Sequence, residues 1–491
     1  MIYFSSFLWK ITSSRFSFPI PMVFLSALCA GTLSAQESPA APVVSHPQIG
    51  VCTHFAGRWD PNLLLPLIVQ SGAGWIRDEI YWGSMEKEKG VYHIEEHSMR
   101  WIDAAHAAGL KILLIFVKDN PIYAPDIYNP DAYAKAAAFV AKELAGKVQA
   151  IEVLNEPANF GFSKHYGGPW NGVEKDGSVS PWVGKYVGLL NKTAKAVKAA
   201  NPRMKVVGLG SVAPVNFRQL AMRLDSRVDG ITEHPYSFQT QPEFQAFGAG
   251  MVARDGVAVA DERGTFASLI WNYRRQSAKY GGPREIWLTE WGWSNFIEHK
   301  PQQYAGFTRS AQAKYTLRRL AESLGLGIAV SVIYDFKDDG TDPSEVEQNF
   351  GLVDYHLKPK PSYEAVRRFA TVMADYKPKQ NFDVKISAPV TNLSIHPISD
   401  GEKTNKNIAC HQFADSKGRP LIALWSTDRA GGDTNPPVAT VEIAGNLPGT
   451  RVKALDLLSG ESFDVPAEVQ DNKIILKHLA IPDAPLALTF E

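Results

Sequence analysis

Two glutamates close apolar, strand-like runs and could bring a pair of carboxylates into one cavity. Glu156 ends the run that begins at Val148, and Pro157 follows it directly. Because proline cannot donate to a sheet ladder, the strand should stop there and leave Glu156 at its end. Glu290 closes a second run, which begins at Glu285. An ionised carboxylate at the end of a buried strand is costly unless it is paired or functional, so both positions are candidates for chemistry.

Two carboxylates that face each other across a cavity are the groups that glycoside hydrolysis requires. One carboxylic acid protonates the leaving oxygen, and the other carboxylate attacks the anomeric carbon of the sugar. This double displacement places the carboxyl groups about 5 Å apart, whereas an inverting mechanism separates them by roughly 6.5–9.5 Å. Neither motif is specific by itself, since Asn-Glu-Pro is an ordinary loop start and a strand-end glutamate is often a surface charge.

The segments that would position these glutamates alternate between residues 48 and 376. Short runs rich in β-branched residues precede helical stretches rich in Ala, Lys, Leu and Arg. The expected strands are Ile49–His54, Trp75–Tyr81, Lys111–Val117, Val148–Leu154, Lys205–Leu209, Gly230–Glu233, Glu285–Thr289 and Ile328–Tyr334. The expected helices are Pro61–Gln70, Ser98–Ala108, Pro130–Ala145, Trp182–Ala200, Asn216–Leu224, Gly264–Tyr280, Gln303–Ser323 and Ser362–Asp375.

This alternation predicts a (β/α)8 TIM barrel, an α/β fold in which chemistry is done at the carboxyl ends of the strands. The fourth and seventh strands lie across such a barrel from each other, so Glu156 and Glu290 would face one another. An open doubly wound sheet is the alternative fold, but no glycine-rich dinucleotide loop follows the first strand. The long segment 159–181, rich in Gly and aromatic residues, would shape the cleft beside Glu156.

Residues 377–491 have a different pattern, in which short alternating runs are separated by turn signals. The expected strands are Asn407–Phe413, Leu421–Trp425, Ala439–Ile443, Val452–Leu457, Lys473–Leu476 and Leu486–Phe490. This pattern predicts a C-terminal antiparallel β-sandwich. Trp425 is its only tryptophan, so we expect no exposed row of aromatic rings and favour a structural role over glycan binding.

The first 35 residues differ from the rest of the chain. Two basic residues are their only charges, and an apolar stretch runs from about Phe18 to Leu33. This predicts a signal peptide over residues 1–35 with cleavage near Ala35, a linker over residues 36–47, and a secreted or periplasmic protein. A membrane anchor is the alternative, but about 15 apolar residues, interrupted by prolines, fall short of the roughly 20 that span a bilayer.

The composition excludes several other classes of protein. The 491 residues carry 51 basic and 51 acidic side chains, so no net charge attracts a nucleic acid. Hydrophobic residues make up 45%, which excludes a disordered chain. Three cysteines exclude a disulfide scaffold and a CxxC zinc site, and Cys52 and Cys410 should be unpaired. After the signal, no segment is long and apolar enough for stable membrane insertion.

The residues around both glutamates carry a resemblance to a known group of enzymes. Asn-Glu-Pro at 155–157 and Thr-Glu-Trp-Gly at 289–292 resemble the clan A retaining glycoside hydrolases. The resemblance implies that Glu156 is the acid/base, that Glu290 is the nucleophile and that Asn155 hydrogen-bonds the sugar 2-hydroxyl. On this hypothesis the substrate is a poly- or oligosaccharide, and neither a cofactor nor a metal is needed.

Further positions match the same clan, in particular glycoside hydrolase family 39 and related bacterial exopolysaccharide glycosidases. Arg77 on the second strand resembles the buried arginine that steadies the nucleophile, although pairing with Glu79 or with a carboxylate core would explain it equally. His234 and Tyr236 end the sixth strand as the clan's histidine and tyrosine do, although His234 could also be a satisfied buried histidine. Gly-Leu-Val-Asp and Lys-Pro-Lys-Pro-Ser-Tyr within 351–363 are similar to family 39.

Aromatic residues near the expected strand ends are candidates for substrate binding, because sugar C–H faces stack on aromatic rings. We expect this role for Trp170 in the long loop, and for Trp291 or Trp293 after the seventh strand. Tyr334 ends the eighth strand where many clan members place a tryptophan. This departure affects the expected substrate more than the expected reaction.

Two patterns bear on metal binding. His93-Ile-Glu-Glu-His97 matches the HxxEH pattern, but the helix should begin only near Glu95, so the two histidines should diverge. His54 on the first strand has no His-x-His partner, which weakens a metal-dependent barrel hydrolase. That class, and a carbohydrate-binding barrel without activity, remain the alternatives to hydrolysis by two carboxylates.

Overall fold

The computed structural model describes residues 45–210, 212–245, 252–300, 302–388, 407–430, 436–446 and 448–491. The predicted signal peptide and most of the predicted linker lie outside these residues. His46, inside the predicted linker, already begins the first strand. Within the described ranges, no helix is long and apolar enough to cross a membrane.

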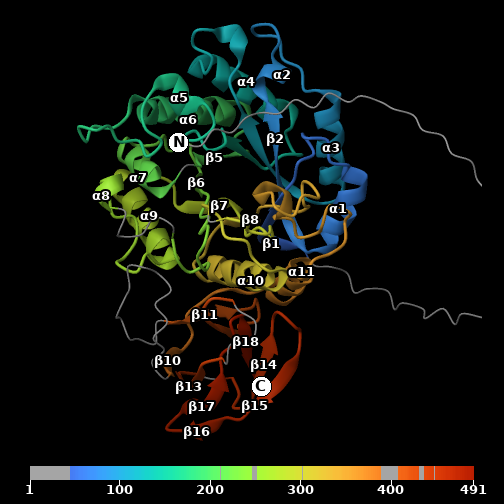
Figure 1. Cartoon of the computed structure of the whole chain (residues 1–491), viewed down its shortest axis with the longest axis vertical. Coiled ribbons are helices and arrows are strands. Elements are labelled where there is room, and N and C mark those ends of the chain that lie inside the picture. Colours follow the sequence, from blue (N-terminus) through green and yellow to red (C-terminus); the bar gives the residue numbers. More distant parts are fainter. Residues whose placement is uncertain are drawn as a thin grey trace, which may run out of the picture. The chain divides into compact units, whose positions relative to one another are not determined.

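Eight parallel strands close into a barrel in sequence order (Figure 1). They are β1 (His46–Cys52), β2 (Ala73–Tyr81), β3 (Lys111–Val117), β4 (Ala150–Val153), β5 (Lys205–Leu209), β6 (Gly230–Glu233), β7 (Glu285–Trp291) and β8 (Val330–Ile333). The barrel closes where Ile49, Gly50 and Val51 of β1 pair with β8. The predicted (β/α)8 barrel is therefore confirmed, and the doubly wound alternative is wrong.

Helices cover the outside of the barrel between successive strands (Figure 1). The long ones are α1 (Pro61–Gln70), α3 (Glu96–Ala107), α4 (Pro130–Glu143), α6 (Pro181–Ala200), α7 (Ala213–Ala221), α9 (Phe266–Tyr280), α10 (Arg309–Gly325) and α11 (Pro361–Met373). Short helical turns lie in the connections: α2 (Trp82–Met85), η1 (Pro121–Tyr123), α5 (Phe162–Tyr166), α8 (Val252–Asp255) and η3 (Val346–Asn349). Helix α10 begins at Arg309 and not at the predicted Gln303, because the Thr308 side chain caps it by accepting the Ala311 N–H.

The interior of the barrel changes character from one end to the other. Near the amino ends of the strands, Trp75 and Trp287 pack edge to face with ring centroids 5.4 Å apart. Small and branched side chains pack with them inside the barrel, among them Leu113, Ala150, Val207, Val330 and Val332. Toward the carboxyl ends, the charged side chains of Arg77 and Glu152 are buried instead. A packed apolar core below a charged mouth is typical of barrels that carry a site at that mouth.

Two antiparallel sheets form the C-terminal part. One has the strand order β10 (Asp383–Ser387), β13 (Val438–Ala444), β17 (Lys473–Ala480), β16 (Glu468–Gln470). The other has the order β15 (Ser462–Val465), β14 (Val452–Asp456), β18 (Leu486–Phe490), β12 (Pro420–Ser426), β11 (Ile408–Ala414), β9 (Lys377–Pro378). The predicted β-sandwich is confirmed. Strands β10, β15 and β16 are not predicted, because their largely exposed residues carry little apolar signal.

Helix α10 meets the sandwich through buried polar contacts. Arg318 donates to Glu243 Oε1 at 2.8 Å and to the Asp428 carbonyl oxygen at 2.8 Å. The Trp425 indole N–H donates to the same Glu243 oxygen at 2.7 Å, and the Trp425 ring is fully buried. Because this ring is used in joining sandwich and barrel, its burial supports the structural role expected for the C-terminal part.

Candidate active site

The carboxyl end of β4 has an unusual backbone. Leu154 and Glu156 have φ angles of 61° and 39°, in the left-handed region that residues other than glycine seldom adopt. Asn159 and Phe160 donate their backbone N–H groups to the Glu156 carbonyl oxygen at 2.8 and 3.1 Å, so a tight turn follows. The Asn159 side-chain amide also donates to Glu156 Oε2 at 2.8 Å. Such strained residues persist only where their surroundings hold them, and they cluster at functional sites.

Strand β7 turns two consecutive side chains into the barrel, which a regular strand cannot do. Its register with β8 shifts between Leu288 and Trp291, so an extra residue forms a bulge there. Thr289 and Glu290 consequently both contact residues of the barrel interior. Gly292 follows the bulge, and a Cβ at this position would collide with the backbone at the end of β8. The glycine of the Thr-Glu-Trp-Gly motif thus allows the chain after β7 to lie close to the backbone at the end of β8.

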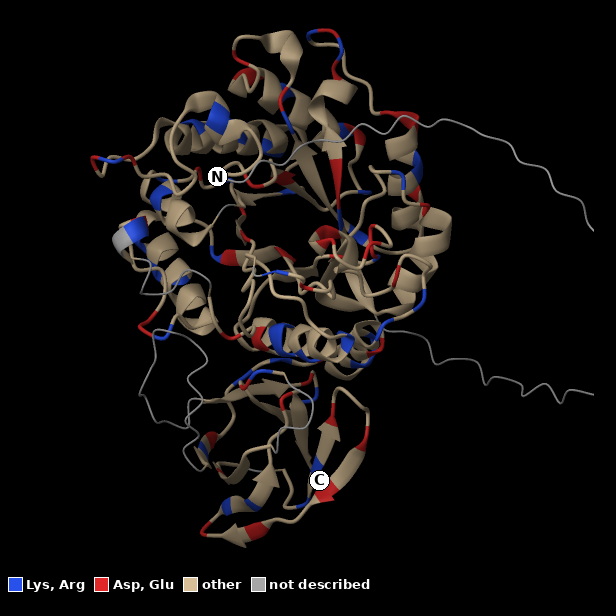
Figure 2. Ribbon diagram, in the orientation of Figure 1, with Lys and Arg blue, Asp and Glu red and all other residues tan. Residues whose placement is uncertain are grey.

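The two predicted carboxylates share one site. A carboxylate oxygen of Glu156 and one of Glu290 lie within 4.8 Å of each other and of a ring nitrogen of His234. The glutamate side chains are 16% and 13% exposed, so a ligand can reach them. Figure 2 shows further acidic positions on the strands and loops around the barrel axis. The two strand ends expected to face each other across the barrel therefore do so.

Glu290 is oriented by two hydrogen bonds. Arg77 donates from Nη1 to Glu290 Oε2 at 2.9 Å, and Tyr236 donates its hydroxyl to Oε1 at 2.7 Å. Arg77 also donates from Nη2 to the Asn155 side-chain oxygen at 2.9 Å, which fixes that amide beside the carboxylates. Charge-assisted hydrogen bonds of this kind hold a carboxylate in one orientation.

Glu152 is a member of the site that the sequence motifs do not predict. It lies on β4, is fully buried, and accepts hydrogen bonds from Arg77 Nε at 2.7 Å and the Thr289 hydroxyl at 2.9 Å. Burial opposes its ionisation, but the charges and hydrogen bonds of Arg77 and His234 together lower the pKa of Glu152 to about 2. Glu79, the other partner considered for Arg77, accepts the Tyr81 hydroxyl instead. An acid inside the apolar run of β4 is the signal that would have revealed Glu152.

His234 lies between the carboxylates. Its Nδ1 is 2.7 Å from Glu156 Oε1, and its Nε2 is 3.0 Å from the Thr289 hydroxyl. Burial alone would lower its pKa, but the Glu290 charge and the neighbouring Glu152 and Glu156 raise the pKa of His234 to about 10. His234 is therefore an imidazolium at neutral pH. Burial opposes ionisation of Glu156 in turn, but the His234 hydrogen bond and charge lower the pKa of Glu156.

The aromatic residues predicted to bind substrate lie in different environments. Tyr334 is partly exposed, and its ring centroid is 5.8 Å from that of His54 and 6.4 Å from that of Tyr236. Trp291 and Trp293 are 0% and 3% exposed and pack on each other in the core between strands and helices. A buried ring offers no face to a sugar, so the prediction that one of these two stacks on substrate is wrong. The β7 bulge turns Glu290 inward, and the neighbouring rings join the core instead.

The long loop after β4 carries two exposed aromatic residues. Trp170 is 38% exposed, and the Arg254 guanidinium lies 5.0 Å from its ring centroid. Its role in substrate binding stays a prediction. Phe160, which the sequence motifs do not single out, is 62% exposed and forms part of the turn at Glu156.

The histidines of the HxxEH pattern do not act together. His93 is exposed and precedes α3, whereas His97 lies in its first turn with Nε2 2.7 Å from the Phe55 carbonyl oxygen. The helix begins at Glu96, close to the predicted start. Two other groups among the described residues are close enough to hold a metal ion: Glu156, His234 and Glu290, and His54, Asp335 and Asp339.

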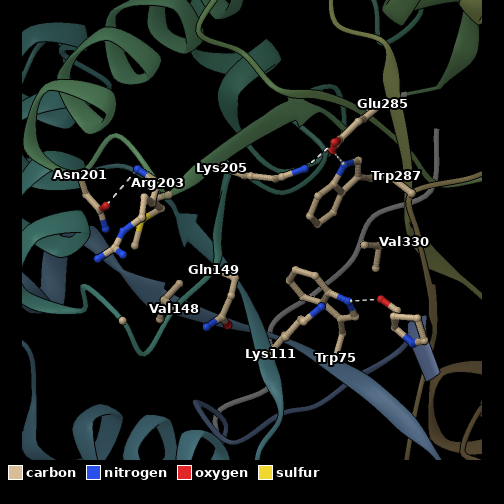
Figure 3. Close-up of a pocket in the computed structure, with 14 residues that line it drawn as sticks. Trp75, Lys111, Val148, Gln149, Asn201, Arg203, Lys205, Glu285, Trp287 and Val330 are labelled. Atoms are coloured by element: carbon tan, nitrogen blue, oxygen red, sulfur yellow. Dashed lines mark hydrogen bonds and ion pairs between the residues drawn. The ribbon is translucent and has the colours of Figure 1, made fainter. Parts of the chain in front are cut away.

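A cavity of about 530 Å³ lies at the opposite end of the barrel, where the strands begin (Figure 3). Trp75, Trp287, Lys111, Lys205 and Glu285 are among the residues that line it. Lys205 pairs with Glu285, and the two lysine ammonium groups lie 5.2 and 5.7 Å from the centroids of the Trp75 and Trp287 rings. The opposed carboxylates, the bulge and the strained backbone all lie at the other end, which we therefore take as the candidate active site.

Comparison with known proteins identifies relatives of the fold. No protein-family model matches the chain, and no curated protein matches it. The structure resembles a family 39 glycoside hydrolase from the gut symbiont Bacteroides cellulosilyticus WH2, with 22% identity over 91% of this chain and 81% of that chain, and a TM-score of 0.64.

Two further solved structures are similar over nearly their whole length. The family 39 enzyme from Xanthomonas axonopodis pv. citri is 14% identical, with 94% of this chain and 100% of that chain covered and a TM-score of 0.52. A monomeric β-xylosidase from Caulobacter crescentus CB15 is 15% identical, with 92% and 97% covered and a TM-score of 0.52. At these identities the likeness establishes the fold, a barrel with a C-terminal sandwich, and confirms the fold that the resemblance implies.

Proposed function

We propose that the protein is a retaining glycoside hydrolase that uses Glu290 as nucleophile and Glu156 as acid/base. The observation that carries this proposal is the approach of their carboxylate oxygens to within 4.8 Å. That approach fits the roughly 5–5.5 Å separation of retaining enzymes better than the 6.5–9.5 Å of inverting ones. The glycoside hydrolases of the same fold, and the motifs around both glutamates, support the same conclusion.

In the first step, Glu290 would attack the anomeric carbon while Glu156 protonates the leaving oxygen. Arg77 and Tyr236 hold one Glu290 oxygen each, so the carboxylate is already oriented for attack. As an imidazolium, His234 donates its Nδ1 proton to Glu156 Oε1 at 2.7 Å, and two such coupled groups titrate as a unit. Transfer of that proton from His234 Nδ1 to Glu156 would give the acid that this step requires.

In the second step, a water molecule would replace the leaving group and Glu156 would act as base. The His234 hydrogen bond and charge, working against burial, lower the pKa of Glu156. This favours the carboxylate, which is the form that removes a proton from water. Attack of the water on the anomeric carbon would release Glu290 and leave the sugar with its original configuration.

Two more residues would contact the sugar. Asn155 is fixed by Arg77 and would hydrogen-bond the 2-hydroxyl group. Tyr334 is partly exposed beside Tyr236 and would border the ring of the sugar. We expect a poly- or oligosaccharide as substrate, because the long loop at Glu156 offers exposed aromatic surface beyond the carboxylates.

The test is hydrolysis by the purified full-length chain of a panel of aryl glycosides and intact polysaccharides. Xylosides come first, because one structural neighbour is described as a β-xylosidase. The first-formed product, followed by NMR, should keep the anomeric configuration of the substrate, and turnover should persist in a strong chelator. No release from any substrate, or an inverted first product, would contradict the proposal. Loss of turnover in the chelator would favour the metal-dependent alternative if His54→Asn, which disrupts the other cluster close enough to hold an ion, is active and loses turnover in the same way.

We also propose that the protein is secreted or periplasmic, on the basis of the predicted signal peptide over residues 1–35. Expression of the full-length chain with its own leader should give an exported protein. N-terminal sequencing should place the new terminus just after Ala35. Retention of Met1 in the exported fraction would contradict this.

A further inference from the structure

A second cluster of histidine and acidic side chains lies where β1 and β8 end. His54 follows β1, and Asp335 and Asp339 follow β8. One ligand atom from each of these three residues lies within 4.8 Å of the other two. The proposed hydrolysis gives these groups no role, so their arrangement needs a separate explanation.

Asp335 sets this cluster apart from an ordinary group of acids. The residue is fully buried, and neither of its carboxylate oxygens has a hydrogen-bond partner among the described residues. A buried carboxylate without a partner is strongly unfavourable, because it has lost its water and gained nothing in return. One of its oxygens belongs to the set of ligand atoms shared with His54 and Asp339.

Neighbouring acids show that the fold can satisfy a carboxylate in this region. Asp78 accepts the Thr53 hydroxyl at 2.7 Å and three backbone N–H groups. Asp338 pairs with Lys360 at 2.7 Å and accepts a backbone N–H. Asp335, in the same region, has neither kind of partner in the part of the chain that the structure describes, so its oxygens are available to a ligand.

Lys337 is one of the cations near Asp335, but its ammonium group is directed elsewhere. Its Nζ donates to the Asp338 carbonyl oxygen at 2.9 Å and lies over two aromatic rings, 4.9 and 4.5 Å from their centroids. The ion pair at this place joins His54 Nδ1 to Asp339 Oδ1 at 3.0 Å, and it leaves Asp335 out. The cluster therefore has one carboxylate more than its histidine can pair with.

We propose that His54, Asp335 and Asp339 bind one divalent transition-metal ion, with Zn²⁺ as the first candidate. One imidazole nitrogen and two carboxylate oxygens form a ligand set that zinc accepts, and water can complete the site. Ligand atoms about 2.1 Å from a tetrahedral zinc ion lie about 3.4 Å apart. Since the three atoms already lie within 4.8 Å of one another, the cluster needs to contract by only about 1.4 Å at most.

The ion would be structural, and it would join the loop after β1 to the loop after β8. Tyr334 directly precedes Asp335, and its ring lies 5.8 Å from that of His54. Fixing the Asp335 carboxylate would therefore also fix the aromatic residue that borders the candidate active site. This inference does not rest on the proposed hydrolysis, because an inactive protein would still bind the ion.

Metal content and thermal stability test this inference directly. The full-length chain is stripped with a chelator, incubated with a small excess of ZnCl₂, desalted and analysed by mass spectrometry for zinc. The wild type should retain one Zn²⁺ per chain and gain Tm. Asp335→Asn and His54→Asn should each weaken Zn²⁺ binding by more than the roughly 10–100-fold that loss of an outer hydrogen-bond partner costs. Ca²⁺, which prefers oxygen ligands alone, should bind more weakly than Zn²⁺.

Two controls separate this site from other acids. Glu345→Gln changes an exposed acid on the same segment after β8 and should bind Zn²⁺ like the wild type. The double variant Glu156→Gln, Glu290→Gln removes the other cluster of acids and histidine, and it should also keep the ion. If Asp335→Asn does not fold, Zn²⁺ binding by His54→Asn tests the proposal instead, because His54 is partly exposed and its substitution disturbs the core less. Zinc that is absent from the wild type, kept by His54→Asn or lost from the double variant would overturn the proposal.

Discussion

The two ends of the barrel use charge in opposite ways. At the amino end, Lys205 and Glu285 pair beside a cavity of about 530 Å³ while remaining 39% and 36% exposed. At the carboxyl end, Arg77, Glu152 and His234 are each 3% exposed or less in their side chains. Exposed ion pairs contribute little to stability, whereas buried ones shift pKa values and hold groups in one geometry. Buried charge therefore distinguishes the candidate active site of this barrel better than cavity volume does.

Removal of Glu290 should have the largest effect. Glu290→Ala should lower kcat by roughly 10⁴–10⁶-fold, the range seen when residues of a covalent catalytic apparatus are removed. Azide should restore turnover and give a product of inverted configuration, because the small anion occupies the space of the carboxylate. Glu285→Gln, on the same strand at the opposite end, is the matched control and should change kcat less than about twofold. Equal losses in the two variants would remove the distinction between the barrel ends.

Glu156→Gln should come next, with a loss of roughly 10²–10⁴-fold in kcat, the usual contribution of a general acid. The loss should be smaller on a dinitrophenyl glycoside, whose leaving group needs no proton. Steady-state kinetics on two aryl glycosides with different leaving groups measure this difference. An equal loss on both substrates would mean that Glu156 does not act as the acid.

Tyr236→Phe removes one hydrogen bond to the Glu290 carboxylate and leaves the ring in place. A hydrogen bond to a charged group contributes about 1.5–3 kcal/mol, so kcat/KM should fall roughly 10–150-fold. Tyr363→Phe removes a hydroxyl that donates to the Leu67 carbonyl oxygen, and it serves as the matched control. It should leave kcat/KM unchanged, and a similar loss in both variants would contradict a direct role for Tyr236.

Buried charge should also make stability depend on pH in both directions. The pKa of His234 is raised from 6.5 to about 10, so its stabilising contribution is complete below pH 6.5 and is lost as pH rises through about 10. The pKa of Glu152 is lowered from 4.5 to about 2, so its contribution is present above pH 4.5 and is lost as pH falls through about 2. The Tm of the wild type should therefore fall more steeply between pH 7 and 10 than that of His234→Gln. Parallel curves would show that His234 is not charged in the folded state.

The smallest effect on activity should come from the amino end. Trp287→Phe replaces a buried indole ring, which packs on Trp75, with a smaller phenyl ring. The substitution should lower the free energy of unfolding by about 1–3 kcal/mol. Urea denaturation measures that loss, and kcat of the folded variant should be unchanged. A lower kcat without a loss of stability would indicate that the amino-end cavity takes part in function.

The barrel and the two glutamates could be predicted because the local signals are strong. Apolar β-branched runs alternate with helical ones through the whole barrel. The expectation that Glu156 ends its strand is less accurate, because β4 ends at Val153 and Glu156 lies in the turn that follows. Helix α10 was harder to place, since its start depends on the Thr308 cap and not on apolar periodicity. Strands such as β16, exposed on both faces, leave no periodic trace in the sequence.

The rest of the site depends on local geometry that alternation does not reveal. A regular strand would turn Thr289 and Glu290 to opposite faces, and only the bulge brings both into the barrel interior. For the same reason Trp291 looks like a residue at the mouth in the sequence but is buried in the core. Glu152 contacts Arg77 across the barrel interior, a long-range pairing that no local motif encodes.

Covalent trapping tests the central claim most directly. The full-length chain is treated with activated 2-deoxy-2-fluoro glycosides, which form the glycosyl-enzyme quickly and release it slowly, and is then digested for mass spectrometry. The proposed mechanism predicts one fluorosugar per chain on the peptide that contains Glu290, and no label in Glu290→Gln. A label on another residue, or hydrolysis with inversion and no trapped sugar, would contradict the assignment of Glu290 as the nucleophile.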